Sequence, residues 1–247
     1  MLQLIESIKN ILTLLKENPS LQTIDQLPKA AAWVGTTNFD LRKPNFVVIH
    51  HTAQNSCEQT LRTFTLERSK VSAHYVICKD GTIHHMLNDY MRAWHGGISK
   101  WGNNSDLNSS SIGIELDNNG FEPFDSAQIN SLLLLLAQLK ENYKIPDANF
   151  IGHADIAPKR KVDPNIQFPW ILLAQKGYGL WFEPDAKFSL PESISIPFAL
   201  AMVGYDIKDT TAALLAFKRH FRADSTAVVT EMDRSALFQL IQNKLSH

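Results

Sequence analysis

Asn45-Phe-Val-Val-Ile-His-His-Thr52 is a short apolar run that ends in polar residues. Its apolar part is rich in β-branched side chains and does not alternate with polar ones, which is typical of a buried strand. The polar side chains begin at His50, where the apolar run stops. We therefore expect a buried strand that presents polar groups at its end.

Several segments further along the chain are also expected to form strands. Ala73–His84 has the pattern of a hairpin with Asp80-Gly81 as its turn. Ser111–Leu116 predicts another strand, and Phe150-Ile151 predicts a last short one. A hairpin therefore lies in the middle of the strand-forming region.

Helical patterns separate these strands. One helix is expected at Glu58–Leu66, and a longer one is capped by Asp125 or Ser126 and ended by Pro146. This mixture predicts an α/β fold with a mixed central sheet flanked by helices, rather than a pure βαβ repeat. The apolar stripe of the longer helix comprises Ile129, Leu132, Leu133, Leu136, Leu139 and Tyr143.

The character of the sequence changes after Trp181. Glu183–Pro197 contains several prolines among polar residues, which suits a linker. Helical patterns follow at Ile196–Val203, Thr210–Phe221 and Asp233–Leu245. A segment of this length is just sufficient for a small helical module.

The composition is that of an ordinary globular protein. A chain of 247 residues with 44% hydrophobic and 20% charged residues can form one sizeable core and a small second domain. The net charge of −1 does not indicate a nucleic-acid-binding protein. Cys57 and Cys78 are the only cysteines, which excludes a disulfide scaffold and a cysteine-rich zinc site but leaves their pairing open.

The N-terminal segment predicts a helix and not a membrane span. No segment reaches the roughly 20 apolar residues that cross a bilayer. Met1–Leu15 lacks the positive start and the small-residue cleavage site of a secretory signal, and its apolar residues share one helical face. Such a helix either docks on its own domain or contacts a partner or a membrane surface.

A second informative stretch is Ile151-Gly-His-Ala-Asp-Ile-Ala-Pro-Lys-Arg-Lys-Val-Asp-Pro164. It is too polar and too interrupted by proline to be core, so we expect a loop that holds reactive groups. A catalytic zinc site takes three protein ligands and keeps one position for water. With so few cysteines the ligands must be histidine or carboxylate, and His50, His153 and Asp163 are candidates.

Five motifs occur in order along residues 45–172: Val48-Ile-His-His-Thr52, Val71-Ser-Ala-His-Tyr75, Ala93-Trp-His-Gly-Gly-Ile-Ser99, Ser111-Ile-Gly-Ile-Glu-Leu116, and Gly152-His-Ala-Asp-Ile-Ala-Pro-Lys-Arg-Lys-Val-Asp-Pro164. Together they resemble the zinc-dependent N-acetylmuramoyl-L-alanine amidases of type 2, the AmpD/AmiD-like family, which is related to peptidoglycan recognition proteins. The match is closest to the AmiD branch, which also has a C-terminal helical module. Any one motif alone would be weak, but five in order are highly specific.

The resemblance implies one zinc ion on His50, His153 and Asp163, with catalytic roles for Glu115 and Lys161. Two neutral imidazoles and one carboxylate leave the metal centre positive, which lowers the pKa of water toward about 7. Glu115 would take a proton from that water and pass it to the departing amine, while Lys161 would stabilise the oxyanion. The alternative for Glu115 is a half-buried strand residue without a catalytic role. The alternative for Lys161 is a solvated charge.

Neighbouring polar residues are assigned as follows. His51 should point away from His50 and is left out of the metal set. Asp155 and Arg160 are expected to hold the loop rather than touch substrate. The loop ends Asp163-Pro-Asn165 where the family often has Asp-Pro-Gly, which changes a turn and not a ligand. Residues expected on the substrate side are Trp94, His95, His74 and Asn118.

The implied function is zinc-dependent hydrolysis of the amide between N-acetylmuramic acid and L-alanine, in peptidoglycan and in anhydromuropeptides, for wall turnover or recycling. Alternatives are a non-catalytic peptidoglycan-binding protein and a zinc peptidase acting on the stem peptide. The implied domains are a catalytic domain at 1–183 with an extension at 1–44, a linker at 184–195, and a peptidoglycan-binding-like helical domain at 196–247.

The expected partner is peptidoglycan or a muropeptide, and not a nucleic acid. The AmiD-like architecture favours the periplasm or the outer membrane of a Gram-negative bacterium, with association to the membrane or the wall. Because no export signal is visible, a cytoplasmic location stays open. The sequence specifies neither the oligomeric state nor a preference for intact wall over fragments.

Overall fold

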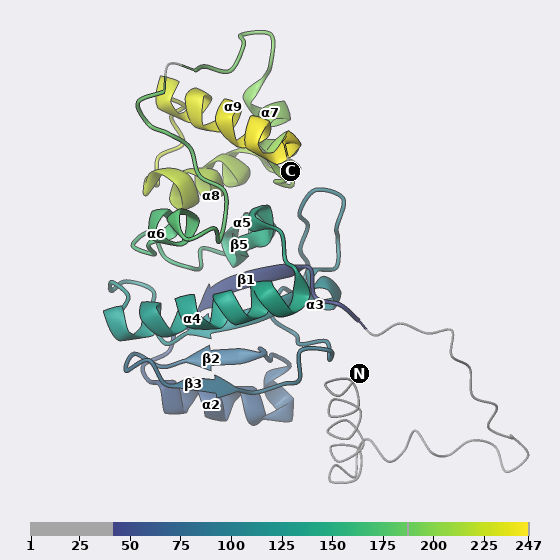
Figure 1. Cartoon of the computed structure of the whole chain (residues 1–247), viewed down its shortest axis with the longest axis vertical. Helices are drawn as coiled ribbons and strands as arrows, with labels where there is room; N and C mark the ends of the chain where they lie inside the picture. The colour runs from purple at the N-terminus through teal and green to yellow at the C-terminus, as the bar shows by residue number, and fades with distance from the viewer. Residues whose placement is uncertain (1–41, 187, 247) are drawn as a thin grey trace, which may run out of the picture. The chain divides into compact units, whose positions relative to one another are not determined.

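The computed structural model describes residues 42–186 and 188–246, which belong to one compact unit, Leu41–His247 (Figure 1). The helix expected at Met1–Leu15 and nearly all of the 1–44 extension lie outside the described residues. Within the described part, no helix combines the length and the apolar character that crossing a membrane requires.

Within the described residues, five strands form one sheet with the order β3-β2-β4-β1-β5. β1 is parallel to β4 and to β5, β2 is parallel to β4, and β2 and β3 form an antiparallel hairpin. The predicted mixed sheet is therefore confirmed. The strands are β1 Phe46–His51, β2 Tyr75–Ile77, β3 Ile83–His85, β4 Ser111–Leu116 and β5 Phe150–Gly152.

The hairpin turn shows why the sequence has Asp80 and Gly81 there. The backbone N–H of Thr82 donates to Asp80 Oδ1 at 2.9 Å, and Gly81 has a φ of 87°, in the left-handed region. A Cβ at Gly81 would also lie 2.8 Å from the carbonyl oxygen of Ala127. The turn therefore packs tightly against the start of α4 (Ser126–Tyr143).

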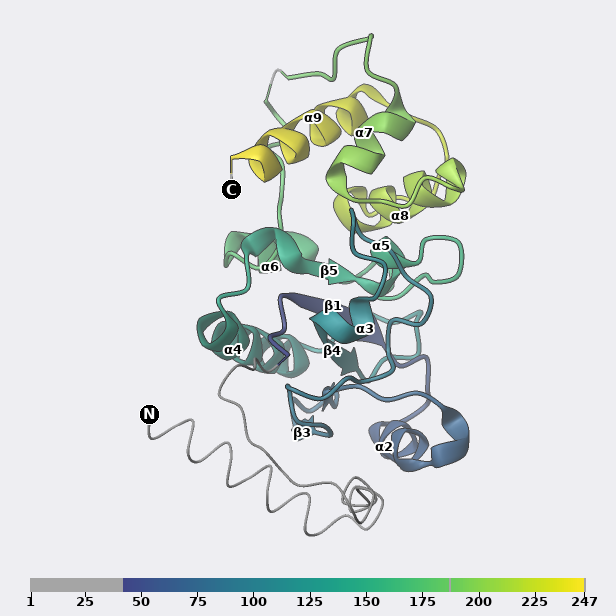
Figure 2. The ribbon, with the colours of Figure 1, turned by 90° about the vertical axis from the view of Figure 1, so that its right-hand side faces the viewer.

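Alternate residues of β1 enter two different cores, and this places the polar end of the strand. Val47 and Ile49 pack with α4, whereas Val48 packs with a core that includes the C-terminal helices. Successive side chains of a strand point to opposite faces, so His50 lies on the face of Val48. Glu115 lies on that face too, because its neighbours in β4 pack toward α4, which covers the other side (Figure 2).

The helix α4 begins after the predicted cap Asp125 but ends earlier than predicted. Its last residue is Tyr143, and Lys144 has a φ of 55°, so the chain leaves the helix before it reaches Pro146. Leu133 is only partly buried, and Leu135 takes its place in the buried stripe.

The other helices surround the sheet and form the C-terminal part. The patterns predicted near Glu58–Leu66 and for the C-terminal helices correspond to observed helices. The helices α3, α5 and α6 were not predicted, because each is too short to show an apolar period. The helices are α2 Cys57–Thr65, α3 Leu107–Ser110, α5 His153–Ile156, α6 Trp170–Gln175, α7 Ile196–Val203, α8 Thr210–Arg222 and α9 Glu231–Leu245, with 3-10 turns η2 Glu67–Ser69 and η3 Asp147–Asn149.

A disulfide bond joins Cys57 and Cys78, which settles the pairing that the sequence left open. The two Cα atoms are 5.4 Å apart, and the bond links residues 21 positions apart in the chain. It ties the first residue of α2 to the residue that follows β2.

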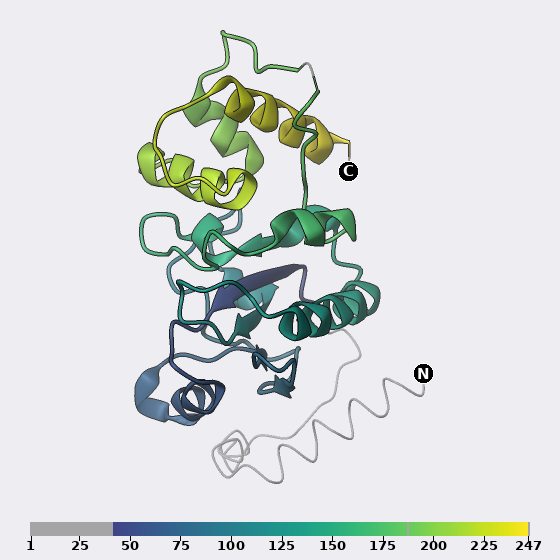
Figure 3. The ribbon, with the colours of Figure 1, turned by 90° about the vertical axis from the view of Figure 1, so that its left-hand side faces the viewer.

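The C-terminal helices share a core with the sheet. Leu200 of α7, Phe217 of α8 and Leu237 of α9 belong to the same buried cluster as Val48 and Ile151. Figure 3 shows these helices packed together beside α5 and α6. The boundaries predicted for a linker and a separate helical domain stay predictions.

Candidate metal centre

Neighbouring strands position the first two functional side chains. In the parallel pairing of β1 and β4, His50 lies beside Glu115, and both occupy the face opposite α4. His50 is buried, with 1% of its surface exposed. The strand expected to deliver polar groups at its end therefore does so.

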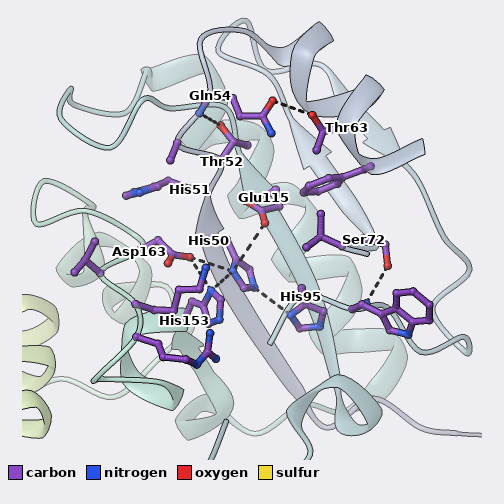
Figure 4. A pocket seen from close by; sticks show the side chains of 17 residues that line it. His50, His51, Thr52, Gln54, Thr63, Ser72, His95, Glu115, His153 and Asp163 are labelled. Carbon is purple, nitrogen blue, oxygen red and sulfur yellow. Dashed lines mark hydrogen bonds and ion pairs between the residues drawn. The ribbon is translucent and has the colours of Figure 1, made fainter. Parts of the chain in front are cut away.

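The loop after β5 brings two further residues to the same place. α5 begins at His153, and the backbone N–H of Ala154 donates to the carbonyl oxygen of Asp163 at 2.7 Å. This hydrogen bond closes the loop, so that His153 and Asp163 lie side by side facing His50 (Figure 4).

Three donor atoms form a compact triangle at this point. His50 Nδ1 is 2.9 Å from His153 Nδ1 and 3.1 Å from Asp163 Oδ2, and His153 Nδ1 is 3.0 Å from Asp163 Oδ2. Tetrahedral zinc with bonds of about 2.0–2.1 Å separates its ligands by roughly 3.3 Å, so a small cation fits with little movement. The predicted ligand set is brought together and could hold a metal ion.

The contact made by His153 Nε2 determines whether Nδ1 carries a proton. His153 Nε2 lies 3.2 Å from the carbonyl oxygen of Gly96, and a carbonyl only accepts. The hydrogen-bond pattern therefore assigns the proton to Nε2. The lone pair on Nδ1 then points into the triangle, as a metal ligand requires.

A longer chain of hydrogen bonds likewise places the proton of His50 on Nε2. The Ser111 hydroxyl donates to the carbonyl oxygen of Leu107 and therefore accepts from His95 Nε2, which is 3.2 Å away. His95 Nδ1 is left to accept from His50 Nε2 at 3.1 Å. His50 Nδ1 then also carries a free lone pair, and such partners orient metal-binding histidines.

Burial sets the charge states of these groups. Burial, together with the nearby His153, lowers the pKa of His50 to about 4, so His50 is neutral at pH 7. Burial alone would raise the pKa of Asp163, but the adjacent imidazole rings of His153 and His50 hold it well below its usual value. Neutral imidazoles and an ionised carboxylate are the forms that bind metals.

Glu115 is a carboxyl group suited to exchanging a proton. Its Oε1 lies 4.0 Å from His50 Nδ1, and its Oε2 is buried without a hydrogen-bond partner among the described residues. Burial and the charge of Asp163 raise the pKa of Glu115 to about 8, against the opposing charge of Lys161. A general base or acid with a pKa near the working pH is the most effective.

These groups open into a pocket of about 380 Å³, shown in Figure 4. Lys161 lines this pocket together with the three candidate ligands. Trp94, which was predicted on the substrate side, lines it as well and is 48% exposed. The lining is polar at the three candidate ligands and apolar at Trp94 and Val162, so it suits a ligand with both polar and apolar parts.

Two other residues predicted on the substrate side are fully buried. His74 is fully buried, with Nδ1 accepting from the backbone N–H of Gly113 at 3.0 Å and Nε2 lying 3.0 Å from the carbonyl oxygen of Met91. Asn118 is also fully buried and donates to carbonyl oxygens of the loop that follows it. Both side chains contact backbone groups, and neither lines this pocket.

His95 lines the pocket, but sequence reasoning missed what it does there. Both of its ring nitrogens are engaged, so His95 acts on His50 rather than being free for substrate. The signal for this was Gly113 in the middle of a strand, which often marks a close approach. A Cβ at Gly113 would lie 2.4 Å from the His95 ring.

The residues expected to hold the loop have structural contacts. Arg160 donates to the carbonyl oxygens of Gly96 and Ile98, at 2.9 and 2.6 Å. His51 Nδ1 accepts from the backbone N–H of Asn165 at 3.0 Å and stays outside the triangle. The polar residues of this loop thus divide into those that face the pocket and those that fix the backbone.

Residues 40–166, just over half of the chain, match the family model described as N-acetylmuramoyl-L-alanine amidase. The chain belongs to this amidase family. Among curated relatives, AmiD of Escherichia coli K12 is 37% identical over 209 residues, which cover 71% of this chain and 74% of AmiD.

Solved amidase structures extend the similarity beyond the matched segment. E. coli AmiD in complex with anhydro-N-acetylmuramic acid-L-Ala-D-gamma-Glu-L-Lys has a TM-score of 0.73 and 30% identity, covering 89% of this amidase and 93% of that chain. AmpDh3 of Pseudomonas aeruginosa in complex with anhydromuramic pentapeptide has a TM-score of 0.75 and 26% identity, covering 89% and 99%. Such coverage is much larger than the segment 40–166 that the family model matches.

Proposed function

We propose that this amidase cleaves the bond between N-acetylmuramic acid and L-alanine with one zinc ion held by His50, His153 and Asp163. The observation that carries the proposal is the triangle of donor atoms about 3 Å apart, beside a carboxyl oxygen of Glu115 that has no hydrogen-bond partner within residues 42–186 and 188–246. Zinc supplies, when bound, a Lewis acid for the amide carbonyl and a lower pKa for water.

Glu115 is proposed as the proton carrier. Its carboxylate accepts a proton from the attacking water and later delivers it to the amine of L-alanine, so that the leaving group departs neutral. Its buried position in β4 fixes the carboxyl group next to His50 and raises its pKa to about 8. A carboxyl group tuned in this way can serve as base and then as acid near neutral pH.

Lys161 is proposed to stabilise the negative charge that develops on the amide oxygen. It lines the pocket and stands two residues before Asp163. A fixed positive charge near the reacting carbonyl is worth more inside a pocket than in water. Its ammonium group also favours the ionised form of Glu115.

The proposed substrates are peptidoglycan and its anhydromuropeptide fragments. The bound molecules of the AmiD and AmpDh3 structures are anhydromuramic peptides, which supports this class for the present chain. Trp94 and Val162 on the rim offer exposed apolar surface to a sugar ring or a peptide. The retained ligand triangle argues against a protein that binds peptidoglycan without cleaving it.

The test is digestion of a purified anhydromuropeptide, followed by mass analysis of the products. We expect release of the intact stem peptide, loss of activity with a chelator, and recovery when zinc is added. Glu115→Gln should lower kcat by about 10²–10⁴-fold with zinc content unchanged. Cleavage within the stem peptide would instead indicate a peptidase, and full activity after complete metal removal would refute the zinc mechanism.

We further propose that the enzyme works in the periplasm or at the outer membrane of a Gram-negative bacterium. The Cys57–Cys78 disulfide supports this location, because disulfides persist in oxidising compartments and are rare in the cytosol. Cell fractionation with thiol labelling tests the proposal. Recovery of the protein in the cytoplasm with both thiols reduced would favour the cytoplasmic alternative.

A further inference from the structure

The buried carboxylate of Asp155 connects the candidate metal loop to the C-terminal helices. Asp155 is 1% exposed and lies in α5, the helix that begins at His153. Its Oδ2 accepts from the backbone N–H of Gly152 and from His220 Nδ1, both at 2.7 Å, and its Oδ1 accepts from the Tyr205 hydroxyl at 2.8 Å. Two of these three donors come from the C-terminal part.

The backbone that Asp155 holds is the point where β5 passes into α5. A Cβ at Gly152 would lie 2.9 Å from Pro164 Cδ and 3.0 Å from the Trp170 ring. Gly152 precedes one proposed ligand, His153, and Pro164 follows the other, so the two ends of the loop touch here. The hydrogen bond from Gly152 to Asp155 therefore fixes the position from which both ligands are presented.

The donors from the C-terminal part are themselves held rigidly. The His220 ring stacks on Trp170, with centroids 3.8 Å apart and planes 15° from parallel. The Tyr205 ring packs edge-on against Trp101, with centroids 5.0 Å apart. Neither His220 nor Tyr205 lines the pocket. Both can therefore influence the metal site only through the groups that they contact.

We propose that Tyr205 and His220 are positioning residues that act through Asp155, so that the C-terminal helices help to set the metal affinity of the site. A buried carboxylate that loses a donor must move or attract another, and either response shifts the backbone next to His153. The inference rests on the proposed role of His153 and Asp163 as metal ligands.

The test compares the same substitution at two tyrosines that each donate to a buried carboxylate. Tyr205→Phe removes the bond to Asp155, and Tyr143→Phe removes a 2.8 Å bond to Asp89, away from the loop. Zinc affinity is measured on the full chain by competition with a chromophoric chelator, and Tm is measured on the metal-free protein. We expect both variants to lower Tm, and only Tyr205→Phe to weaken zinc binding, by about tenfold.

His220→Phe is the second variant, since it keeps a ring against Trp170 and removes the donor to Asp155. It should weaken zinc binding in the same way, and Tyr205→Phe decides alone if His220→Phe does not fold. Zinc affinities in these variants equal to that of Tyr143→Phe would overturn the inference while leaving the proposed function intact. A wild-type chain that binds no zinc would overturn the proposed function and this inference with it.

Discussion

At the scale of single residues, the Nε2 atom of each candidate histidine ligand faces away from the triangle and contacts a hydrogen-bond acceptor. The carbonyl oxygen of Gly96 places the proton of His153 on Nε2, and the chain of hydrogen bonds through His95 places the proton of His50 on Nε2. Removing the hydrogen-bond partner of a metal-binding histidine commonly lowers metal affinity by about 10–100-fold. His95 is therefore expected to matter for metal binding although it does not belong to the triangle.

His95→Phe keeps a ring in place but removes the acceptor for His50 Nε2. We expect zinc affinity to fall by about 10–100-fold, because a buried donor is left unpaired and His50 is free to turn. Gly113→Ala should act in the same direction, since its Cβ would collide with the His95 ring. Chelator competition measures the effect, and His84→Phe, on β3 and away from the pocket, is the control. Unchanged zinc affinity in both variants would show that the hydrogen bond to His95 does not hold His50 in place.

Asp89 gives a prediction for stability against pH. Burial alone would raise its pKa, but His85, whose Nε2 is 3.6 Å away, and hydrogen bonds from Tyr143 and Tyr75 hold the pKa below its usual value. A carboxyl group whose pKa is lower in the folded state stabilises the fold above the unfolded pKa of about 4 and loses that effect as the pH falls further. The carboxylate of Asp89 in turn raises the pKa of His85. The stabilisation from protonated His85 is fully present below its unfolded pKa and is lost as the pH rises through the raised value.

Asp89→Asn should therefore lower the free energy of unfolding by about 1–3 kcal/mol near pH 6, and by less below pH 4. Denaturant unfolding of the wild type and the variant at a series of pH values measures the difference. A difference that is as large at pH 3 as at pH 6 would mean that the charge of Asp89 is not what stabilises the protein.

At the scale of elements, local patterns were sufficient where the element carries its own signal. The strand at Phe46–His51, the hairpin turn at Asp80 and the helix α4 follow from a continuous β-branched apolar run, turn chemistry and apolar period, respectively. The one-turn helix α5 and the burial of His74 do not, because they depend on partners far away in the chain. The candidate ligands were predictable because a motif carried them, whereas their supporting contacts cross between elements.

The disulfide is a link between two such elements. Cys57→Ser with Cys78→Ser frees the start of α2 from the end of β2, and closing a loop of this length is worth about 3 kcal/mol. We expect a lower Tm in the double variant and a comparable loss when the wild type is reduced. Thermal unfolding with and without reductant checks this, and reductant should not affect the double variant. A wild-type Tm that does not respond to reductant would contradict a stabilising bond.

At the scale of the whole molecule, the chain places its candidate site between two cores. α4 covers one face of the sheet, and the opposite face carries the site and continues into a core shared with α7, α8 and α9. The predicted peptidoglycan-binding role of residues 196–247 remains a proposal. The shared core indicates that these helices also contribute to the stability of the site itself.

A shared core predicts that the metal site and the C-terminal helices unfold together. Phe217→Ala empties a fully buried position of α8 and should lower the free energy of unfolding by about 3–5 kcal/mol. Phe198→Ala is the matched control, since Phe198 on α7 is 57% exposed and its loss should change stability by less than about 0.5 kcal/mol. Helix content by circular dichroism and zinc release by a chelating dye are followed during the same denaturant titration. We expect one midpoint for both signals in every variant, shifted in Phe217→Ala only. Helix loss well before zinc release in Phe217→Ala would show that the C-terminal helices unfold as an independent unit, and the sheet with its loop would then hold the metal without them.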